Sequence, residues 1–132
     1  MTKLRILFLA CVMLTLCASV GASVGDGFYC GVVQEGKFYH DGRGEWISFF
    51  FVDVGEAQHD RLVKNLGEAY YESGEYEVKS EIHIYTTNKN ISLKDYVGKK
   101  ISFKGEFFEA HTMNHGRDIV FEIKELRIDS AP

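Results

Sequence analysis

Two histidines four residues apart, His111 and His115, are the side chains of this chain best suited to chemistry. They lie in the polar stretch Ala110-His-Thr-Met-Asn-His-Gly116, between two apolar segments, where we expect a turn. Imidazole is the commonest transition-metal ligand in proteins. The pair therefore suggests a metal or small-ligand site on a loop.

A metal site at this loop would need at least one further ligand from elsewhere in the chain. His40, His83 or Asp118 could supply it, but local spacing fixes none of them, and the His-Glu-x-x-His pattern is absent. The alternative, which the residue types favour, is that His111 and Thr112 hydrogen-bond loop amides and hold the turn in shape. We therefore expect no resident cofactor.

Sequence patterns of hydrolytic enzymes are missing as well. The chain has no Gly-x-Ser-x-Gly elbow, no closely paired carboxylates, and no cysteine in a histidine-rich context after residue 22. We therefore expect a binding protein rather than an enzyme.

Aromatic residues supply the second set of candidate site residues. Trp46, next to the run 49–51 of three phenylalanines, could form a stacking platform, although such clusters more often belong to the core, which we favour. Tyr70, Tyr71 and Tyr76 could form a protein-binding surface, because tyrosine is enriched in interfaces. The alternative is that these tyrosines pack a helix onto the rest of the domain.

Five extended segments must position these side chains. Residues 76–85 alternate between apolar and polar types, and residues 45–54 are rich in β-branched and aromatic types, as is typical of strands. The glycine-rich, polar residues 35–44 indicate a loop. The predicted strands are Gly27–Gln34, Glu45–Val54, Tyr76–Tyr85, Lys100–Phe108 and Asp118–Ile128.

Two helices are predicted between these strands. Residues 56–71 repeat apolar side chains at three- and four-residue steps, which indicates a short amphipathic helix. A second helix, residues 92–97, should begin at Ser92, with Asp95 completing a capping box, and should end at Gly98.

This element order predicts a mostly β fold: a small five-stranded oligonucleotide/oligosaccharide-binding (OB)-like barrel. A short helix lies between strands three and four, and a further helix lies between strands two and three. Closing the sheet removes its exposed edges and buries Phe103 and Phe121. Gly105, in mid-strand, predicts a bulge or a barrel corner.

The first residues have the layout of a secretory signal peptide. Lys3 and Arg5 precede the apolar run Ile6–Leu16, which is too short to span a bilayer, and small residues follow. We predict cleavage between Ala22 and Ser23, so that residues 1–22 are the signal and residues 23–132 are one OB-like domain. A lipid anchor at Cys17 is disfavoured by the bulky Leu16.

The formal charge of the exported domain limits the classes of partner that it is suited to bind. Removing residues 1–22 leaves 13 Lys and Arg against 19 Asp and Glu, a formal charge of −6. An acidic chain without a basic cluster is unsuited to nucleic acid, and no later apolar stretch is long enough for stable membrane insertion. Cys30 would be the single remaining cysteine, which we expect to be a buried thiol rather than a disulfide to another chain.

The block Tyr96–Thr112 resembles a family of small exported bacterial proteins known only as a domain of unknown function. The shared run is Gly-Lys-Lys-hydrophobic-x-hydrophobic-x-Gly-x-hydrophobic-Phe-x-Ala-x-Thr, followed by a histidine-rich turn and an apolar strand. The likeness covers the chain from Glu81 onward. Here the turn keeps only His115, between Asn114 and Gly116, which argues against a metal or catalytic role for it. The resemblance implies an exported OB-like domain and no chemistry.

Together these features predict an exported, non-enzymatic binding module, periplasmic or secreted. It would recognise a protein partner in the envelope through the barrel loops and the segment Glu56–Tyr71, as an inhibitor or immunity protein does. The alternative is a periplasmic metal- or small-ligand-binding protein that uses His111 and His115.

Overall fold

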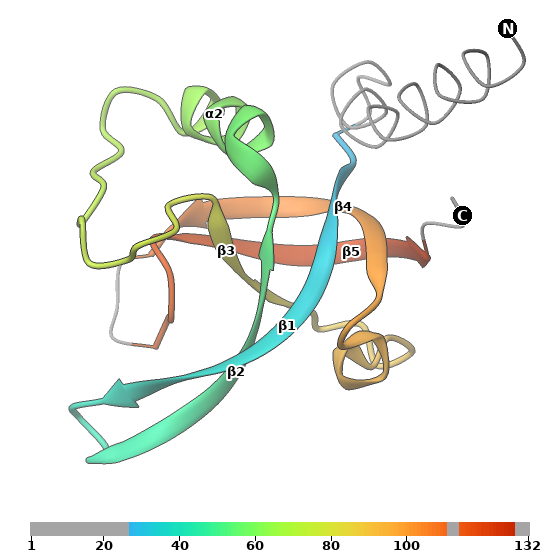
Figure 1. Cartoon of the computed structure of the whole chain (residues 1–132), viewed down its shortest axis with the longest axis horizontal. Coiled ribbons are helices and arrows are strands. Elements are labelled where there is room, and N and C mark those ends of the chain that lie inside the picture. The colour runs from blue at the N-terminus through green and yellow to red at the C-terminus, as the bar shows by residue number, and fades with distance from the viewer. Residues whose placement is uncertain (1–26, 111–113, 129–132) are drawn as a thin grey trace, which may run out of the picture.

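The computed structural model of the chain describes residues 27–110 and 114–128 (Figure 1). Five strands form a closed barrel in the order β1-β2-β3-β5-β4. The strands are β1 (Tyr29–His40), β2 (Glu45–Asp53), β3 (Glu81–Tyr85), β4 (Lys100–Glu109) and β5 (Ile119–Ile128). The helix α2 (Gly55–Leu66) follows β2, and the 3₁₀ helix η1 (Leu93–Tyr96) follows β3. The predicted mostly β, five-stranded barrel is confirmed.

One parallel pair among antiparallel neighbours closes the barrel. β3 runs parallel to β5, with His83 opposite Val120, whereas every other adjacent pair is antiparallel. The β1–β4 pair, with Tyr29 opposite Phe103, brings the first strand back to the fourth. This order, with its parallel third and fifth strands, is the arrangement of an OB-like barrel.

The barrel interior is apolar. Phe103 and Phe121 are 0% exposed, as predicted, and their rings meet edge to face with centroids 5.0 Å apart. The cluster around them is drawn from all five strands, α2 and η1: Tyr29, Val33, Val52, Val54, Leu62, Ile82, Ile84, Leu93, Ile101, Ile119 and Ile123. Burial of these side chains supplies the main force for closure.

Gly105 marks the predicted bulge in β4. The β4–β5 register shifts between Lys104 and Gly105, and a Cβ atom added at Gly105 would lie 1.9 Å from the carbonyl oxygen of Glu122. Only glycine lets the two backbones approach this closely.

β1 is longer than predicted. Residues 35–40, predicted to be loop, continue the strand and pair with β2 from Val33 opposite Val52 to His40 opposite Glu45. The turn is confined to residues 41–44, where Arg43 and Gly44 donate backbone hydrogen bonds to the His40 carbonyl. Pairing with β2 therefore overrides the turn-like composition of these residues.

β3 is shorter than predicted, and so is α2. Residues 76–80 alternate like a strand but form none, because β2 ends at Asp53 opposite Glu81 and leaves them no partner. α2 ends at Leu66 rather than at residue 71, because Gly67 takes a positive φ of 88°. The predicted second helix is a single 3₁₀ turn, η1, and Ser92 makes no side-chain cap.

α2 is fastened to one end of the barrel by Gln58. Its side-chain oxygen accepts the backbone N–H of Cys30 (3.0 Å), and its amide donates to the carbonyls of Cys30 (3.1 Å) and Val54 (2.6 Å). Cys30 is buried, as predicted, but it is disulfide-bonded, so the prediction of a free thiol was wrong. Cys11 and Cys17 lie outside the described residues.

Phe28, which precedes β1, and Arg127, near the end of β5, meet at this end of the barrel, although β4 lies between the two strands. The guanidinium of Arg127 lies over the Phe28 ring, 4.1 Å from its centroid. Arg61 of α2 donates to the Phe28 carbonyl (2.9 Å) and covers the Tyr29 ring.

Candidate functional site

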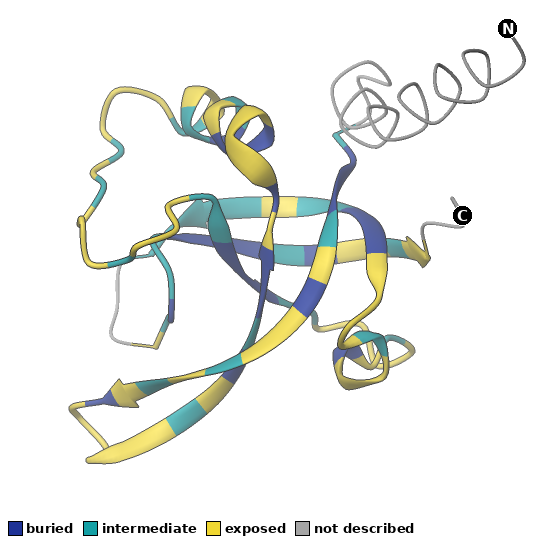
Figure 2. Ribbon diagram, viewed as in Figure 1, coloured by how far each residue is buried: buried dark blue, intermediate teal, exposed yellow. Residues whose placement is uncertain are grey.

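The first candidate surface is a two-stranded arm, residues 34–49, that projects from the barrel (Figure 1). β2 pairs with β3 only from Phe50 onward, and the β1–β4 pairing ends at Val32. Beyond these points the two strands of the arm pair only with each other. Most of the arm is exposed (Figure 2).

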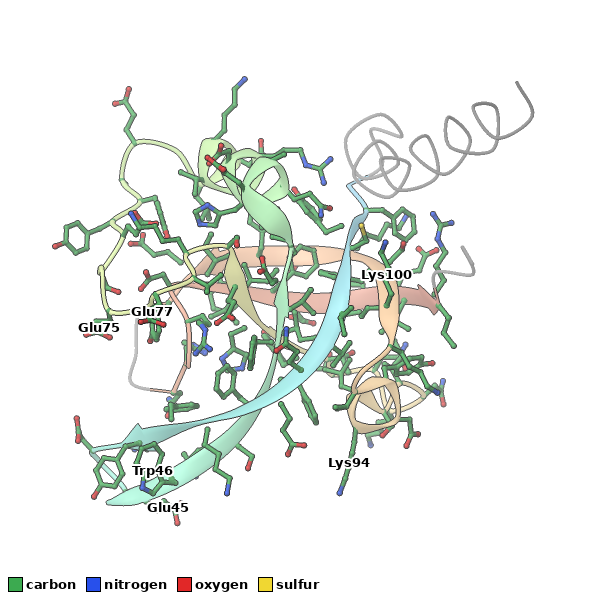
Figure 3. All side chains as sticks on the ribbon, in the orientation of Figure 1. Glu45, Trp46, Glu75, Glu77, Lys94 and Lys100 are labelled. Atoms are coloured by element: carbon green, nitrogen blue, oxygen red, sulfur yellow. The ribbon has the colours of Figure 1, made fainter. Side chains whose placement is uncertain are left out.

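Trp46 and Tyr39 form an exposed aromatic pair near the end of the arm. They are opposite each other in the register, 67% and 49% exposed, with centroids 5.6 Å apart in an edge-to-face contact. Figure 3 places Trp46 beside Glu45 at the arm's end, away from the barrel. Core burial of Trp46, which the sequence favours, is therefore wrong, whereas its neighbours Phe49 and Phe51 are buried.

The pair lies on the continuation of the barrel's inner face. Side chains alternate between the two faces of a strand, so Tyr39 shares its face with buried Val33, six residues earlier, and Trp46 shares its face with Val52. The strand face whose side chains fill the core therefore continues beyond the barrel, where its side chains are exposed to solvent.

The outer face of the arm is covered by the loop between β4 and β5. Phe38 and Phe49 meet edge to face on it at 5.6 Å. Gly116 lies directly on the Phe49 ring, since a Cβ at Gly116 would be 2.5 Å from its Cζ. Any side chain here would force the loop off the ring.

Buried His83 holds this loop in place. Its Nδ1 accepts the backbone N–H of Gly116 (3.0 Å), so in the neutral ring the proton sits on Nε2. Burial lowers the pKa of His83 to about 4, with smaller effects from His115 and Arg117. At neutral pH His83 is therefore an uncharged acceptor that anchors the loop.

Arg117 ties the loop to three elements at once. Its guanidinium donates to Glu81 Oε1 at 3.0 and 2.8 Å, and it lies over the rings of Phe49, Phe51 and Tyr76. Both members of the ion pair are largely buried, which strengthens the contact relative to a surface pair.

Of the predicted loop residues, His111 and Thr112 lie outside the described part of the chain. The side chain of His115 is half-buried, with its ring 5.4 Å from that of His83 and 5.8 Å from that of Phe108. His40 Nε2 lies 2.6 Å from Asn114 Oδ1, which links the loop to the arm. Within residues 27–110 and 114–128, no three His, Cys, Asp or Glu side chains are grouped to hold a metal.

Tyr70 and Tyr71 lie in the segment 67–80, which joins α2 to β3 without helix or strand. Tyr71 is 75% exposed. Burial, with help from Asp118, Glu72 and Glu109, raises the pKa of Tyr70 to about 12, so its phenol stays protonated. These tyrosines belong to a different surface from Trp46.

The segment 67–80 is held against the barrel by hydrogen bonds to β4 and to the residue before β5. Tyr71 donates its backbone N–H to Glu109 (3.0 Å), and Ser73 donates its own to Asp118 (3.2 Å). Ser80 donates its hydroxyl to Asp53 (2.6 Å). Asp118, predicted as a third metal ligand, is therefore used to position this segment.

A cavity of about 630 Å³ opens between α2 and this segment. Its walls are Glu56, His59, Asp60, Val63, Tyr70, Glu72, Glu77, Val78, Lys79 and Ser80. The sequence predicts that the segment Glu56–Tyr71 takes part in binding, but it singles out Tyr70 alone among the residues of this cavity. The available signal was the spacing of Glu56, His59, Asp60 and Val63, which places them on one helix face.

The fold and these surfaces define a small mostly β barrel with an exposed arm and an acidic cavity. No family model, no curated protein and no solved structure matches the chain. Across the residues placed by the structure, none of the helices has the length and apolar character needed to cross a membrane.

Proposed function

We propose that this protein is an exported, non-enzymatic module that binds a protein partner of the cell envelope, as an inhibitor or immunity protein does. The observation that carries the proposal is the exposed Trp46–Tyr39 pair on the projecting arm. Tryptophan and tyrosine dominate the energetic centres of protein interfaces. A tryptophan two-thirds exposed on a two-stranded arm is accessible for such a contact.

The way the arm is held supports the same proposal. Its outer face is packed under Gly116 and Arg117, while its inner face is left open. An aromatic pair held on paired strands loses little conformational freedom on binding, which lowers the entropic cost of association. The arm is therefore suited to insertion into a concave partner.

The charge of the exported domain indicates the kind of partner. With residues 1–22 removed, the formal charge is −6. Opposite charge on the partner would steer encounter and exclude acidic proteins. A basic envelope or secreted protein fits best.

Capture from the native envelope fraction tests the proposal. The immobilised wild-type domain should retain a basic protein at low salt, and Trp46→Ala should weaken retention at least about tenfold, as truncation of an interface centre does. Ile128→Ala, exposed on β5 outside the arm, is the matched control and should bind like wild type. Retention of no protein, or equal retention by Trp46→Ala, would overturn the proposal.

Export has its own test. Mass spectrometry of protein purified from the exporting host should find Ser23 at the amino terminus. A chain that still begins at residue 1 would contradict the signal peptide.

The second candidate is metal or small-ligand binding at His111 and His115. It is favoured by one contact, the 5.4 Å approach of the His83 and His115 rings. Zinc should then raise the melting temperature of the wild-type domain but not that of a His111→Ala, His115→Ala double variant. Equal melting temperatures with and without zinc would end this alternative.

A further inference from the structure

The cavity between α2 and the segment 67–80 is lined by four carboxylates. Glu56 and Asp60 come from α2, and Glu72 and Glu77 come from the segment. Its one lysine, Lys79, pairs with Glu72 at 3.2 Å. In the part of the chain that the structure describes, no lysine or arginine pairs with Glu56, Asp60 or Glu77. Figure 3 shows Glu77 on the segment below α2.

This arrangement costs stability in the free protein. Glu56 and Asp60 are four residues apart on one helix face, where like charges repel. The segment brings two more carboxylates to the same cavity. A cation placed among them would relieve this repulsion.

Buried His59 gives an independent reason to expect a ligand. Its side chain forms part of the cavity wall, the residue is 7% exposed, and its Nε2 has no hydrogen-bond partner among the described residues. Its Nδ1 faces the Asp60 carboxylate at 3.9 Å, which favours the proton on Nδ1 and leaves Nε2 as an acceptor. An unpaired buried polar atom destabilises the fold. This nitrogen has less than 1 Å² of exposed surface, so the His59 ring must turn toward the cavity before an N–H donor there can supply the missing partner.

The remaining walls fit a long side chain with an apolar stem. Val63 and Val78 are apolar, and Tyr70 adds an aromatic side chain to the lining. Arginine carries an alkyl stem and five N–H donors in a planar fork, and it pairs with several oxygens at once. A volume of about 630 Å³ gives room for the whole side chain.

We propose that this cavity binds an arginine side chain of a basic protein partner. The inference rests on the proposed function, since it names the chemistry by which that partner is recognised. The guanidinium lies among Glu56, Asp60 and Glu77, and it donates to His59 Nε2 once the ring has turned toward the cavity. The arm and the cavity are then two separate contacts with one partner.

Titration of the ¹⁵N-labelled exported domain with an acetylated, amidated Gly-Arg-Gly peptide tests this binding by nuclear magnetic resonance. The amides around His59 and Tyr70 should shift in a saturable way. A Glu56→Gln, Asp60→Asn double variant should weaken binding at least about tenfold, the loss expected for charged hydrogen bonds. A Glu106→Gln, Glu125→Gln double variant, with both residues exposed on β4 and β5, is the matched charge control and should bind like wild type. Absence of cavity shifts, or equal affinity in the double variant, would overturn the proposal.

The variant His59→Phe separates the contribution of His59 to peptide binding from its contribution to stability. It removes the unpaired nitrogen while keeping a ring, so it should raise the melting temperature and weaken binding of the peptide. A variant that is more stable and binds the peptide as wild type would remove His59 from the site.

Two further comparisons complete the test. The first asks whether the cation belongs to a partner protein or to a free polyamine, and the second asks whether a negative result concerns the cavity alone or the proposed function. Spermidine binding tighter than the arginine peptide would make the cavity a site for free polyamines and overturn the partner-arginine proposal. If Trp46→Ala loses the captured partner but the Glu56→Gln, Asp60→Asn variant does not, this inference fails while the proposed function stands. Cavity shifts with the peptide but no captured partner would overturn the proposed function and leave arginine recognition in place.

Discussion

The barrel interior and the arm each hold an edge-to-face aromatic pair, but the two pairs differ in burial. Phe103 and Phe121 are 0% exposed, with centroids 5.0 Å apart, whereas Tyr39 and Trp46 are 49% and 67% exposed at 5.6 Å. Each pair thus has nearly the same geometry in a different environment. The first pair stabilises the fold, and the second is available to another molecule.

The comparison teaches that strand length, not residue type, separates the two roles. β1 and β2 extend beyond the ends of their pairing with β4 and β3. The face that is buried in the core at Val33 and Val52 is therefore exposed to solvent at Tyr39 and Trp46. Burial of a large apolar side chain is favourable by about 1.5–3 kcal/mol. Tyr39 and Trp46 remain largely exposed after folding, so this free energy would be gained only when a partner buries them.

Truncation of the interior pair should have the largest effect. Phe121→Ala removes a fully buried ring and should lower the free energy of unfolding by about 3–5 kcal/mol. Urea unfolding followed by circular dichroism measures it, with Phe121→Leu as the milder control. A loss below about 0.5 kcal/mol, the usual effect of a surface change, would show that the interior is not the stabilising region.

Acid should cause the second-largest loss of stability, by protonating His83 at the outer face of the arm. The pKa of His83 is lowered from 6.5 in the unfolded chain to about 4 in the fold, so between these values the unfolded state binds more protons. The stabilisation is complete above pH 6.5 and is lost as the pH falls toward 4. At about 1.4 kcal/mol per pKa unit, the loss is on the order of 3 kcal/mol.

His83→Asn tests the origin of this dependence. Asparagine keeps an acceptor for the Gly116 N–H but does not titrate, so the difference in unfolding free energy between the two proteins should shrink as the pH falls from 6.5 to 4. Chemical denaturation at several pH values gives both curves. Parallel curves would mean that other groups cause the acid sensitivity.

Trp46→Ala should have little effect on stability. The side chain is mostly exposed, and surface substitutions usually change the free energy of unfolding by no more than about 0.5 kcal/mol. The same denaturation assay applies. A loss as large as that of Phe121→Ala would mean that the arm belongs to the folding core.

The smallest effect is spectroscopic. Trp46 is the single tryptophan of the chain, so fluorescence excited selectively at tryptophan reports the arm alone. Its emission should be that of a solvated indole and should change little on unfolding, while circular dichroism shows the full transition. A blue-shifted native emission that moves to the red in urea would contradict the exposed arm.

The barrel could be predicted from the sequence because its strands bury at least one face. Apolar residues at Ile101, Phe103, Phe121 and Ile123 mark that face, and Gly105 marks the bulge between β4 and β5. Such alternation is the signal that a half-buried strand leaves in a sequence.

The arm and the third strand were mispredicted for one physical reason. Residues 35–40 form a strand in which only His40 is buried, and their residue types, Glu-Gly-Lys-Phe-Tyr-His, do not alternate between polar and apolar. Residues 76–80 show the alternation but have no partner strand. Pairing is decided by the whole fold, and a local pattern does not contain it.

The candidate site was the least predictable part. Trp46 was assigned to the core because aromatic clusters are usually buried, and its exposure depends on where β2 leaves β3. The acidic cavity depends on the return of residues 67–80 beneath α2, and that return is fixed by contacts with Glu109 and Asp118 far along the chain. His83 could be named from the sequence but not its role as the anchor of Gly116.

The closeness of Phe28 to Arg127 has a practical consequence. A linker joined before Phe28 or after Ile128 would leave the molecule from the same corner, and Figure 1 shows the arm on the opposite side. Anchored to a bead, a sensor chip or a larger carrier through either point, the domain would therefore present Trp46 outward. The attachment point could therefore be moved from one terminus to the other, and Trp46 would still face away from the support.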